Sequence, residues 1–171
     1  MRFKEKVAVV TGGATGIGRA AALQFGLEGA EVIVADVNDV DGAATARAIT
    51  QVRGAARFVR TDVSSETDVR ALMKDVGDAY GYLDILVNCA GIFEGMEVRV
   101  DEFEDDRWEQ VIAVNLKGSY LCAKHAVPLM KKRGAGVILL VASIAGVTVP
   151  SSSIAYGASK GGVHGLAISL E

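Results

Sequence analysis

A tyrosine and a lysine four residues apart, Tyr156 and Lys160, are the pair of side chains in this sequence best suited to proton transfer. Helix positions i and i+4 share a face, so the phenol and the ammonium would address one site. A free phenol has a pKa of about 10 and is mostly protonated at neutral pH. A cation about 4 Å away lowers that pKa and makes the tyrosine a usable general acid and base for an alcohol–ketone pair.

Ser143 lies thirteen residues before Tyr156, at the end of the apolar run Gly136–Ser143. Ligands of open α/β sheets bind at the carboxyl ends of the strands, so we expect Ser143 to face the same site as the tyrosine. Its hydroxyl would hydrogen-bond the substrate oxygen and orient the phenol. The three serines at 151–153 fall in the intervening loop, and we expect them to have no catalytic role.

A glycine-rich segment, Thr11–Gly18, follows the apolar run Val7–Thr11 and precedes a helical pattern. Glycines permit a tight turn and the close approach of a pyrophosphate, while a helix N-terminus supplies free N–H groups and partial positive charge. A plain strand-to-helix turn is the alternative for such a segment taken alone. The residues expected to contact a dinucleotide here are Gly12, Thr15, Gly16, Ile17 and Gly18.

An acid at the end of the second apolar run, Asp36, favours the nucleotide site over the plain turn. A carboxylate in this place accepts hydrogen bonds from the adenosine ribose hydroxyls and repels a 2′-phosphate. Neither Thr15 nor the two residues after the acid, Val37 and Asn38, is basic. The local sequence therefore predicts NAD(H) rather than NADP(H).

The elements that must position these residues alternate between short apolar runs and longer amphipathic segments, which predicts an α/β doubly wound (Rossmann) fold with a mostly parallel sheet and helices on both faces. The expected strands are Val7–Thr11, Glu31–Asp36, Ala56–Arg60, Leu83–Asn88 and Gly136–Ser143. The expected helices are Ile17–Glu28, Asp39–Val52, Glu66–Tyr80, Asp105–Arg133 and Ala155 to the end of the chain. Without a linker or repeat, residues 1–171 are expected to form a single dinucleotide-binding domain.

Composition narrows the class of protein further. The chain has 171 residues and a net charge of −3, which argues against a nucleic-acid partner. Half of the residues are hydrophobic, but the apolar runs are too short to cross a membrane. Two cysteines without CxxC spacing, Cys89 and Cys122, predict neither a disulfide framework nor a zinc site, so we expect no metal and a cytoplasmic location.

Taken together, the ordered motifs resemble the short-chain dehydrogenase/reductase family over the whole chain. The motifs are Gly12-x-x-x-Gly16-x-Gly18, Asp62-Val63, Asn88-Cys89-Ala90-Gly91, Asn115, Ser143 and Tyr156-x-x-x-Lys160. Cys89 stands where the family more often has a second asparagine. A small buried thiol packs like an apolar group, so this departure is expected to be tolerated.

The resemblance implies a role for each of these residues. Tyr156 would be the catalytic acid and base, Lys160 would bind the nicotinamide ribose and lower the tyrosine pKa, and Ser143 would position the substrate. Asn115 would hold a water in a proton relay, although a helix-packing hydrogen bond is the alternative for this amide. The cofactor cleft would be lined by Asp62, Val63, Asn88, Ala90 and Gly91.

The resemblance also implies a strand order of 3-2-1-4-5-6-7, of which strands six and seven are missing from this chain. We therefore expect the 171 residues to be C-terminally incomplete, with strand five at an open edge. Family members associate through the two helices expected at 105–133 and from 155, so a homodimer or homotetramer is expected. Leu121, Ala126, Val163 and Ile168 are among the apolar side chains expected to face the partner.

The leading interpretation is an NAD-dependent oxidoreductase that interconverts a small-molecule secondary alcohol and its ketone. One alternative keeps the fold but changes the cofactor and direction, giving an NADPH-linked ketoreductase of 3-oxoacyl thioesters. A second alternative is a nucleotide-binding fragment with no turnover. Because the C-terminal elements supply most of the substrate pocket in this family, the substrate itself is not specified.

Overall fold

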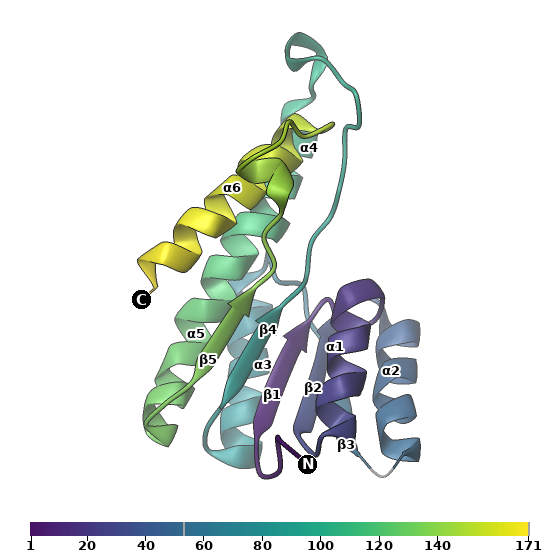
Figure 1. Cartoon of the computed structure of the whole chain (residues 1–171), viewed down its shortest axis with the longest axis vertical. Coiled ribbons are helices and arrows are strands. Elements are labelled where there is room, and N and C mark those ends of the chain that lie inside the picture. Colours follow the sequence, from purple (N-terminus) through teal and green to yellow (C-terminus); the bar gives the residue numbers. More distant parts are fainter. Residues whose placement is uncertain (53, 171) are drawn as a thin grey trace.

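Five parallel strands form the central sheet of the computed structural model, which describes residues 1–52 and 54–170. The strands are β1 (Val7–Thr11), β2 (Glu31–Asp36), β3 (Ala55–Arg60), β4 (Ile85–Asn88) and β5 (Val137–Leu140). Their order is β3-β2-β1-β4-β5, and every neighbouring pair is parallel. This arrangement confirms the predicted doubly wound fold (Figure 1).

Helices cover both faces of the sheet, as a parallel sheet requires. The helices are α1 (Gly16–Leu27), α2 (Asp39–Gln51), α3 (Glu66–Tyr80), α4 (Asp105–Ile112), α5 (Gly118–Arg133) and α6 (Ile154–Ser169). A π-helical segment, η2 (Ala113–Lys117), joins α4 to α5, and 3-10 turns occur at η1 (Val100–Glu102) and η3 (Ile144–Gly146). Figure 1 shows α6 and the β4–α4 connection extending beyond the carboxyl ends of the strands.

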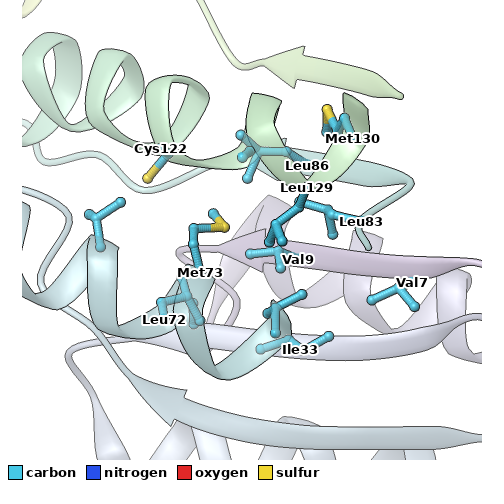
Figure 2. Close-up of a cluster of buried hydrophobic side chains, with 14 of the residues drawn as sticks. Val7, Val9, Ile33, Leu72, Met73, Leu83, Leu86, Cys122, Leu129 and Met130 are labelled. Carbon is cyan, nitrogen blue, oxygen red and sulfur yellow. The ribbon is translucent and has the colours of Figure 1, made fainter. Parts of the chain in front are cut away.

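Two apolar clusters, one on each face of the sheet, hold the layers together. One packs alternate residues of β1, β2 and β4 against α3 and α5, with Leu72, Leu83 and Leu86 almost fully buried (Figure 2). The other packs the remaining strand residues against α1 and α2, where Ala22 and Ile49 are buried. This alternation follows from the two-residue period of a strand, and it fixes the strand ends that carry the site.

The predicted boundaries are correct for the first two strands and for α3, but not everywhere. The fifth strand was expected to run over Gly136–Ser143, yet it covers only Val137–Leu140 because its one neighbour, β4, is itself four residues long. The helix expected over Asp105–Arg133 is interrupted by the π-helical segment. The last helix ends at Ser169, and Glu171 lies outside the described residues.

β5 forms one edge of the sheet, because no described strand pairs with its far side. Its side chains Val137 and Leu139 are 54% and 47% exposed, although both are apolar. A hollow of about 470 Å³ lies along the same edge and is lined by Ile138, Leu140, α5 and the end of α6. The expected apolar edge is therefore present in this structure.

The side chains expected to face a partner on these two helices differ in their burial. Leu121, Ala126 and Val163 are at most 2% exposed, so they belong to the chain's own core and cannot face a partner. The sequence pattern could not separate these cases, since a buried helix face and an intersubunit face are equally apolar. Ile168 on α6, which was also expected to face a partner, is exposed, and so is Tyr120 on α5. Among the described residues, no helix combines the length and apolar character that a membrane crossing needs.

Candidate active site

A cavity of about 610 Å³ opens at the carboxyl ends of β1, β2 and β4. It lies where the chain order of the strands reverses, between β1 and β4, which is the usual ligand crevice of an open α/β sheet. Its lining residues are Gly12, Thr15, Gly16, Ile17, Gly18, Asp36, Val37, Thr61, Asp62, Val63, Cys89, Ala90, Gly91, Ile92, Gln110, Val114 and Val141. Most of the residues that the sequence assigned to the cofactor therefore surround one cavity.

The glycine-rich turn is shaped by close approaches that only glycine allows. Gly12 has a φ of +64°, and a Cβ on it would lie 2.7 Å from the backbone nitrogen of Ala90. A Cβ on Gly18 would collide with the carbonyl oxygen of Gly12. Gly16 differs, because its φ is +53° but nothing lies within 4 Å of its Cβ position. Gly12 and Gly18 thus shape the turn, while Gly16 borders open space.

The N-terminus of α1 lacks the side-chain cap that α2, α3 and α6 have. Asn38, Ser65 and Ser153 each accept a hydrogen bond from the first turn of their helices. Thr15 makes no such bond at α1, and the first turn of α1 contains no acid. Its free N–H groups and positive helix end therefore face the cavity, which fits an anionic pyrophosphate.

Both carboxylate oxygens of Asp36 are held by the backbone at the end of β2. Oδ2 accepts from the Ala14 N–H and Oδ1 from the Asn38 N–H, each at 3.0 Å. The sequence argument found no basic neighbour, but Arg60 is the register partner of Asp36 on β3. The Arg60 guanidinium forms an exposed ion pair of 3.6 Å with Asp39. Chain neighbours alone could not reveal a cation that a parallel strand brings alongside.

The residues of the Asn88–Gly91 motif occupy two different environments. Ala90 and Gly91 line the cavity, whereas Asn88 is 2% exposed and is not among the lining residues. The Asn88 Oδ1 accepts a hydrogen bond of 2.6 Å from the Thr11 hydroxyl. Asn88 can therefore position the cofactor cleft, but its amide does not line it.

Lys160 is buried next to Gly91 and Val141, two of the residues that line the cavity. Its Nζ donates a hydrogen bond of 2.6 Å to the carbonyl oxygen of Val141 and lies 5.8 Å from the centre of the Tyr156 ring. A Cβ on Gly91 would be 3.6 Å from that Nζ, so the glycine leaves room for the ammonium. Burial lowers the pKa of Lys160, and the neighbouring Cys89 thiol acts in the opposite direction.

Tyr156 lies in the first turn of α6, where two loops meet. The edge of the Phe93 ring packs against the Tyr156 ring, with 4.8 Å between centroids. Ser153 donates a hydrogen bond of 2.5 Å to the Glu94 carbonyl and accepts one from the Tyr156 N–H. Ser153 is fully buried and caps α6, which is a structural role in addition to its place in the loop before the helix.

Ser143 lies three residues beyond the end of β5 rather than within it. Its hydroxyl oxygen accepts a hydrogen bond of 3.2 Å from the Ala145 N–H and so begins the 3-10 turn η3. This turn packs tightly on α6, because a Cβ on Gly146 would collide with the Gly161 nitrogen. The hydroxyl proton of Ser143 is not used in that bond and can be donated to a ligand.

The side chain of Asn115 is fully buried and uses its amide within the protein. Its Oδ1 accepts from the Ile92 N–H at 2.8 Å, and its Nδ2 donates to the Ile92 carbonyl and to the Ser159 hydroxyl, each at 3.0 Å. The Ser159 hydroxyl in turn donates to the Tyr156 carbonyl at 2.8 Å. Asn115 therefore connects the cavity wall to the helix that carries Tyr156.

Four residues whose side chains hydrogen-bond to or pack against site residues were not expected to contribute to the site: Phe93, Ser119, Ser153 and Ser159. A serine three residues before Tyr156 is a helix-cap signal that could have identified Ser153. The other three are single polar or aromatic residues in ordinary contexts, and only tertiary contacts distinguish them. Cys122 and Cys89 are free, and no cluster of three metal-ligating side chains occurs within residues 1–52 and 54–170.

One known protein family matches almost the whole chain. A model of the short chain dehydrogenase family matches residues 6–171. The chain belongs to the short-chain dehydrogenase family. It is 43% identical over 165 residues to a 3beta-hydroxysteroid dehydrogenase of Mediterraneibacter gnavus, covering 96% of this chain and 59% of that protein.

Two further proteins are similarly close to this chain. Tropinone reductase-like 1 of Erythroxylum coca is 43% identical over 171 residues, which cover 99% of this chain and 62% of the relative. The crystal structure of gox2181 superposes with a TM-score of 0.93 at 33% identity, over 99% of this chain and 66% of that one. The chain thus spans about three fifths of the length of these curated relatives.

Proposed function

We propose that this short-chain dehydrogenase domain, residues 1–171, binds NAD(H) and oxidises or reduces a secondary alcohol–ketone pair, with Tyr156 as the proton donor and acceptor. One observation carries the proposal: the cavity, the uncapped N-terminus of α1, Lys160 and Tyr156 all lie on the side of the sheet where the strands have their carboxyl ends. A bound nicotinamide dinucleotide supplies the hydride donor or acceptor. The residues of this chain bind it, orient it and move the proton.

Each group at the site has a defined task in this proposal. The free N–H groups of α1 hold the pyrophosphate, and Asp62 and Val63 border the adenine end. The Ser143 hydroxyl donates to the substrate oxygen and holds it near the Tyr156 hydroxyl. In alcohol oxidation the phenolate accepts the hydroxyl proton, and in ketone reduction the phenol returns it. The Lys160 ammonium places a positive charge 5.8 Å from the centre of the Tyr156 ring, opposite in sign to the charge that develops on the phenol oxygen.

NAD(H) is the proposed cofactor because the Asp36 carboxylate is fixed by two backbone N–H groups at the edge of the cavity. A carboxylate so placed accepts ribose hydroxyls and repels a 2′-phosphate. Arg60 is the one observation that favours NADP(H), because it lies beside Asp36 on the next strand. Its guanidinium already faces Asp39, so we assign the preference to Asp36.

The proposed substrate class is an alcohol or ketone carried on a saturated ring. Phe93 is 41% exposed and packs against the Tyr156 ring, and Ile144, Val147 and Val149 expose apolar side chains in the segment that follows Ser143. Such surfaces favour an apolar ring over a charged chain. The names of the two relatives refer to a hydroxysteroid and to tropinone, whose reacting groups are borne on saturated rings.

Isotope transfer tests the proposed function. The chain is incubated with NAD and a ring-borne secondary alcohol, such as cyclohexanol deuterated at the carbinol carbon, and the reduced cofactor is examined by mass spectrometry. The proposal predicts deuterium in the reduced cofactor and far less transfer with NADP. Reduced cofactor without deuterium, or the absence of reduction with every ring alcohol tried, would contradict it.

A further inference from the structure

Ser119, a buried serine of α5, bridges two residues of the site that are far apart in the sequence. Its hydroxyl accepts a hydrogen bond of 2.8 Å from the Asn88 Nδ2 and donates one of 2.6 Å to the backbone carbonyl of Asn115. Ser119 is 3% exposed, and neither neighbour is more exposed. Water therefore cannot replace either bond without entering the core.

The bridge completes a series of hydrogen bonds that runs beneath the cavity. On one side, Thr11 accepts from the Ala90 N–H and donates to Asn88, and Asn88 donates to Ser119. On the other side, the Asn115 amide donates to Ser159, and Ser159 donates to the Tyr156 carbonyl. The hydroxyls of Thr11, Ser119 and Ser159 each accept one hydrogen bond and donate another. Reversing any one of them would leave a neighbour without its partner, so the orientation of the whole series is fixed.

Ser119 acts at the point where the helix departs from α-helical geometry. In η2 the Gly118 N–H bonds to the Ala113 carbonyl, five residues back, so the regular ladder is shifted there. Bulges of this type occur often at functional sites because they turn a side chain to a new direction. Here the bulge contains Asn115. The hydroxyl of Ser119, four residues further along the chain, donates a hydrogen bond to the backbone carbonyl of Asn115.

We propose that Ser119 is a positioning residue for catalysis: its hydroxyl holds the π-helical segment in the register that aims Asn115 at Ile92 and Ser159. The α6 turn carrying Tyr156 is thereby fixed relative to the strand ends that carry the cofactor turn. Catalytic rate depends steeply on such alignment, since a displacement of about 1 Å can reduce it roughly 100-fold.

The first test measures hydrogen exchange and does not depend on the proposed function. Ser119→Ala removes both bonds, and the reporter is the Ile92 amide, which donates to Asn115 rather than to Ser119. Its exchange rate is expressed relative to that of the core amide of Val9, which cancels any change in global stability. Cys122→Ala is the matched control, because Cys122 is fully buried on the same helix among apolar neighbours.

The proposal predicts that Ser119→Ala raises the relative exchange of Ile92 by about tenfold, the scale expected for a lost buried hydrogen bond. Cys122→Ala should leave that ratio unchanged. An equal ratio in the two variants would overturn the proposal. If Ser119→Ala does not fold, Ser119→Cys retains the volume with only a weak donor and must show the same rise.

The second test measures turnover and rests on the proposed function. Ser119→Ala should lower kcat by about tenfold or more while KM and the affinity for NADH stay within about threefold. Unchanged kcat in a wild type that turns over would contradict the positioning role. A wild type without turnover would count against the proposed function alone, because the exchange measurement still decides the role of Ser119.

Discussion

The ammonium of Lys160 donates a hydrogen bond of 2.6 Å to the carbonyl oxygen of Val141, one residue beyond β5. This bond ties α6 to the end of the sheet and holds the charge close to the Tyr156 ring. A carbonyl dipole compensates part of the cost of burying an ammonium, but the pKa of Lys160 is still lowered by burial. Burial of the protonated Lys160 side chain therefore lowers the stability of the folded protein.

That cost makes stability depend on pH with a defined sign. Between the lowered pKa of folded Lys160 and its ordinary value of 10.5, the unfolded chain binds more protons at this residue than the folded chain. The contribution of Lys160 to the free energy of unfolding must therefore rise with pH in this range. Urea unfolding measures the free energy of unfolding of the wild type and of Lys160→Met from about pH 8 to pH 10. As the pH increases over this range, the free energy of unfolding of the wild type should rise relative to that of Lys160→Met. A constant or opposite difference would contradict the sign.

Cofactor preference should depend on Asp36. We expect the chain to bind NADH at least about tenfold more tightly than NADPH, because two like charges near 4 Å repel by up to roughly 4 kcal/mol at an effective dielectric of 20. Asp36→Ala should reduce the difference in affinity between NADH and NADPH, because it removes the repulsion of the 2′-phosphate and leaves the Arg60 guanidinium nearby. The double variant Asp36→Ala, Arg60→Ala serves as the control and should bind NADPH more weakly than Asp36→Ala does. Fluorescence titration of each protein with NADH and with NADPH measures these affinities, and equal affinities of the wild type for the two cofactors would refute the assignment.

Gly16 should be needed for cofactor binding more than for folding. A Cβ there meets no protein atom, so Gly16→Ala should cost only about 1–2 kcal/mol of stability through its positive φ. The same methyl group would occupy the space that the pyrophosphate needs, so the affinity for NADH should fall about tenfold or more. Gly134→Ala is the matched control, since Gly134 also has a positive φ and open space around its Cβ position. Equal losses of NADH affinity in the two variants would show that strain alone is responsible.

Association of the chain should involve the outer faces of α5 and α6. We predict at least a homodimer, in which the exposed Tyr120 and Ile168 contact the partner. Ile168→Glu should then reduce the sedimenting mass at micromolar concentration, because it introduces a charge into an apolar contact. Val40→Glu, on the exposed face of α2, should not change the mass. A monomeric wild type at that concentration would contradict the prediction.

Much of the fold could be predicted because each element carries its own local signal. β1, β2 and α3 begin and end where the sequence pattern placed them, and Gly134 ends α5 in the left-handed conformation expected of a terminating glycine. The ends of β4 and β5 could not be predicted, since strand length there is set by pairing between the two strands.

The site could be predicted in part for the same physical reason. Tyr156 and Lys160 share a face of α6, as their spacing indicates. Asn115 could not be oriented from periodicity, because the π-helical segment changes the direction of its side chain. The bonds to Ile92 and Ser159, and the bridge through Ser119, join segments that are far apart in the sequence and have no local signature.

Tyr156→Phe tests the central claim most directly, because it removes the transferable proton and keeps the ring that packs against Phe93. The measurement is the single-turnover rate of cofactor reduction by a ring alcohol, beside the affinity for NADH, with Tyr82→Phe as control, because the Tyr82 ring packs against Arg133 and not against any residue of the site. The account predicts a rate roughly 10²–10⁴-fold lower in Tyr156→Phe, an NADH affinity within about threefold, and an unaffected control. A Tyr156→Phe protein that reduces the cofactor at close to the wild-type rate would contradict it.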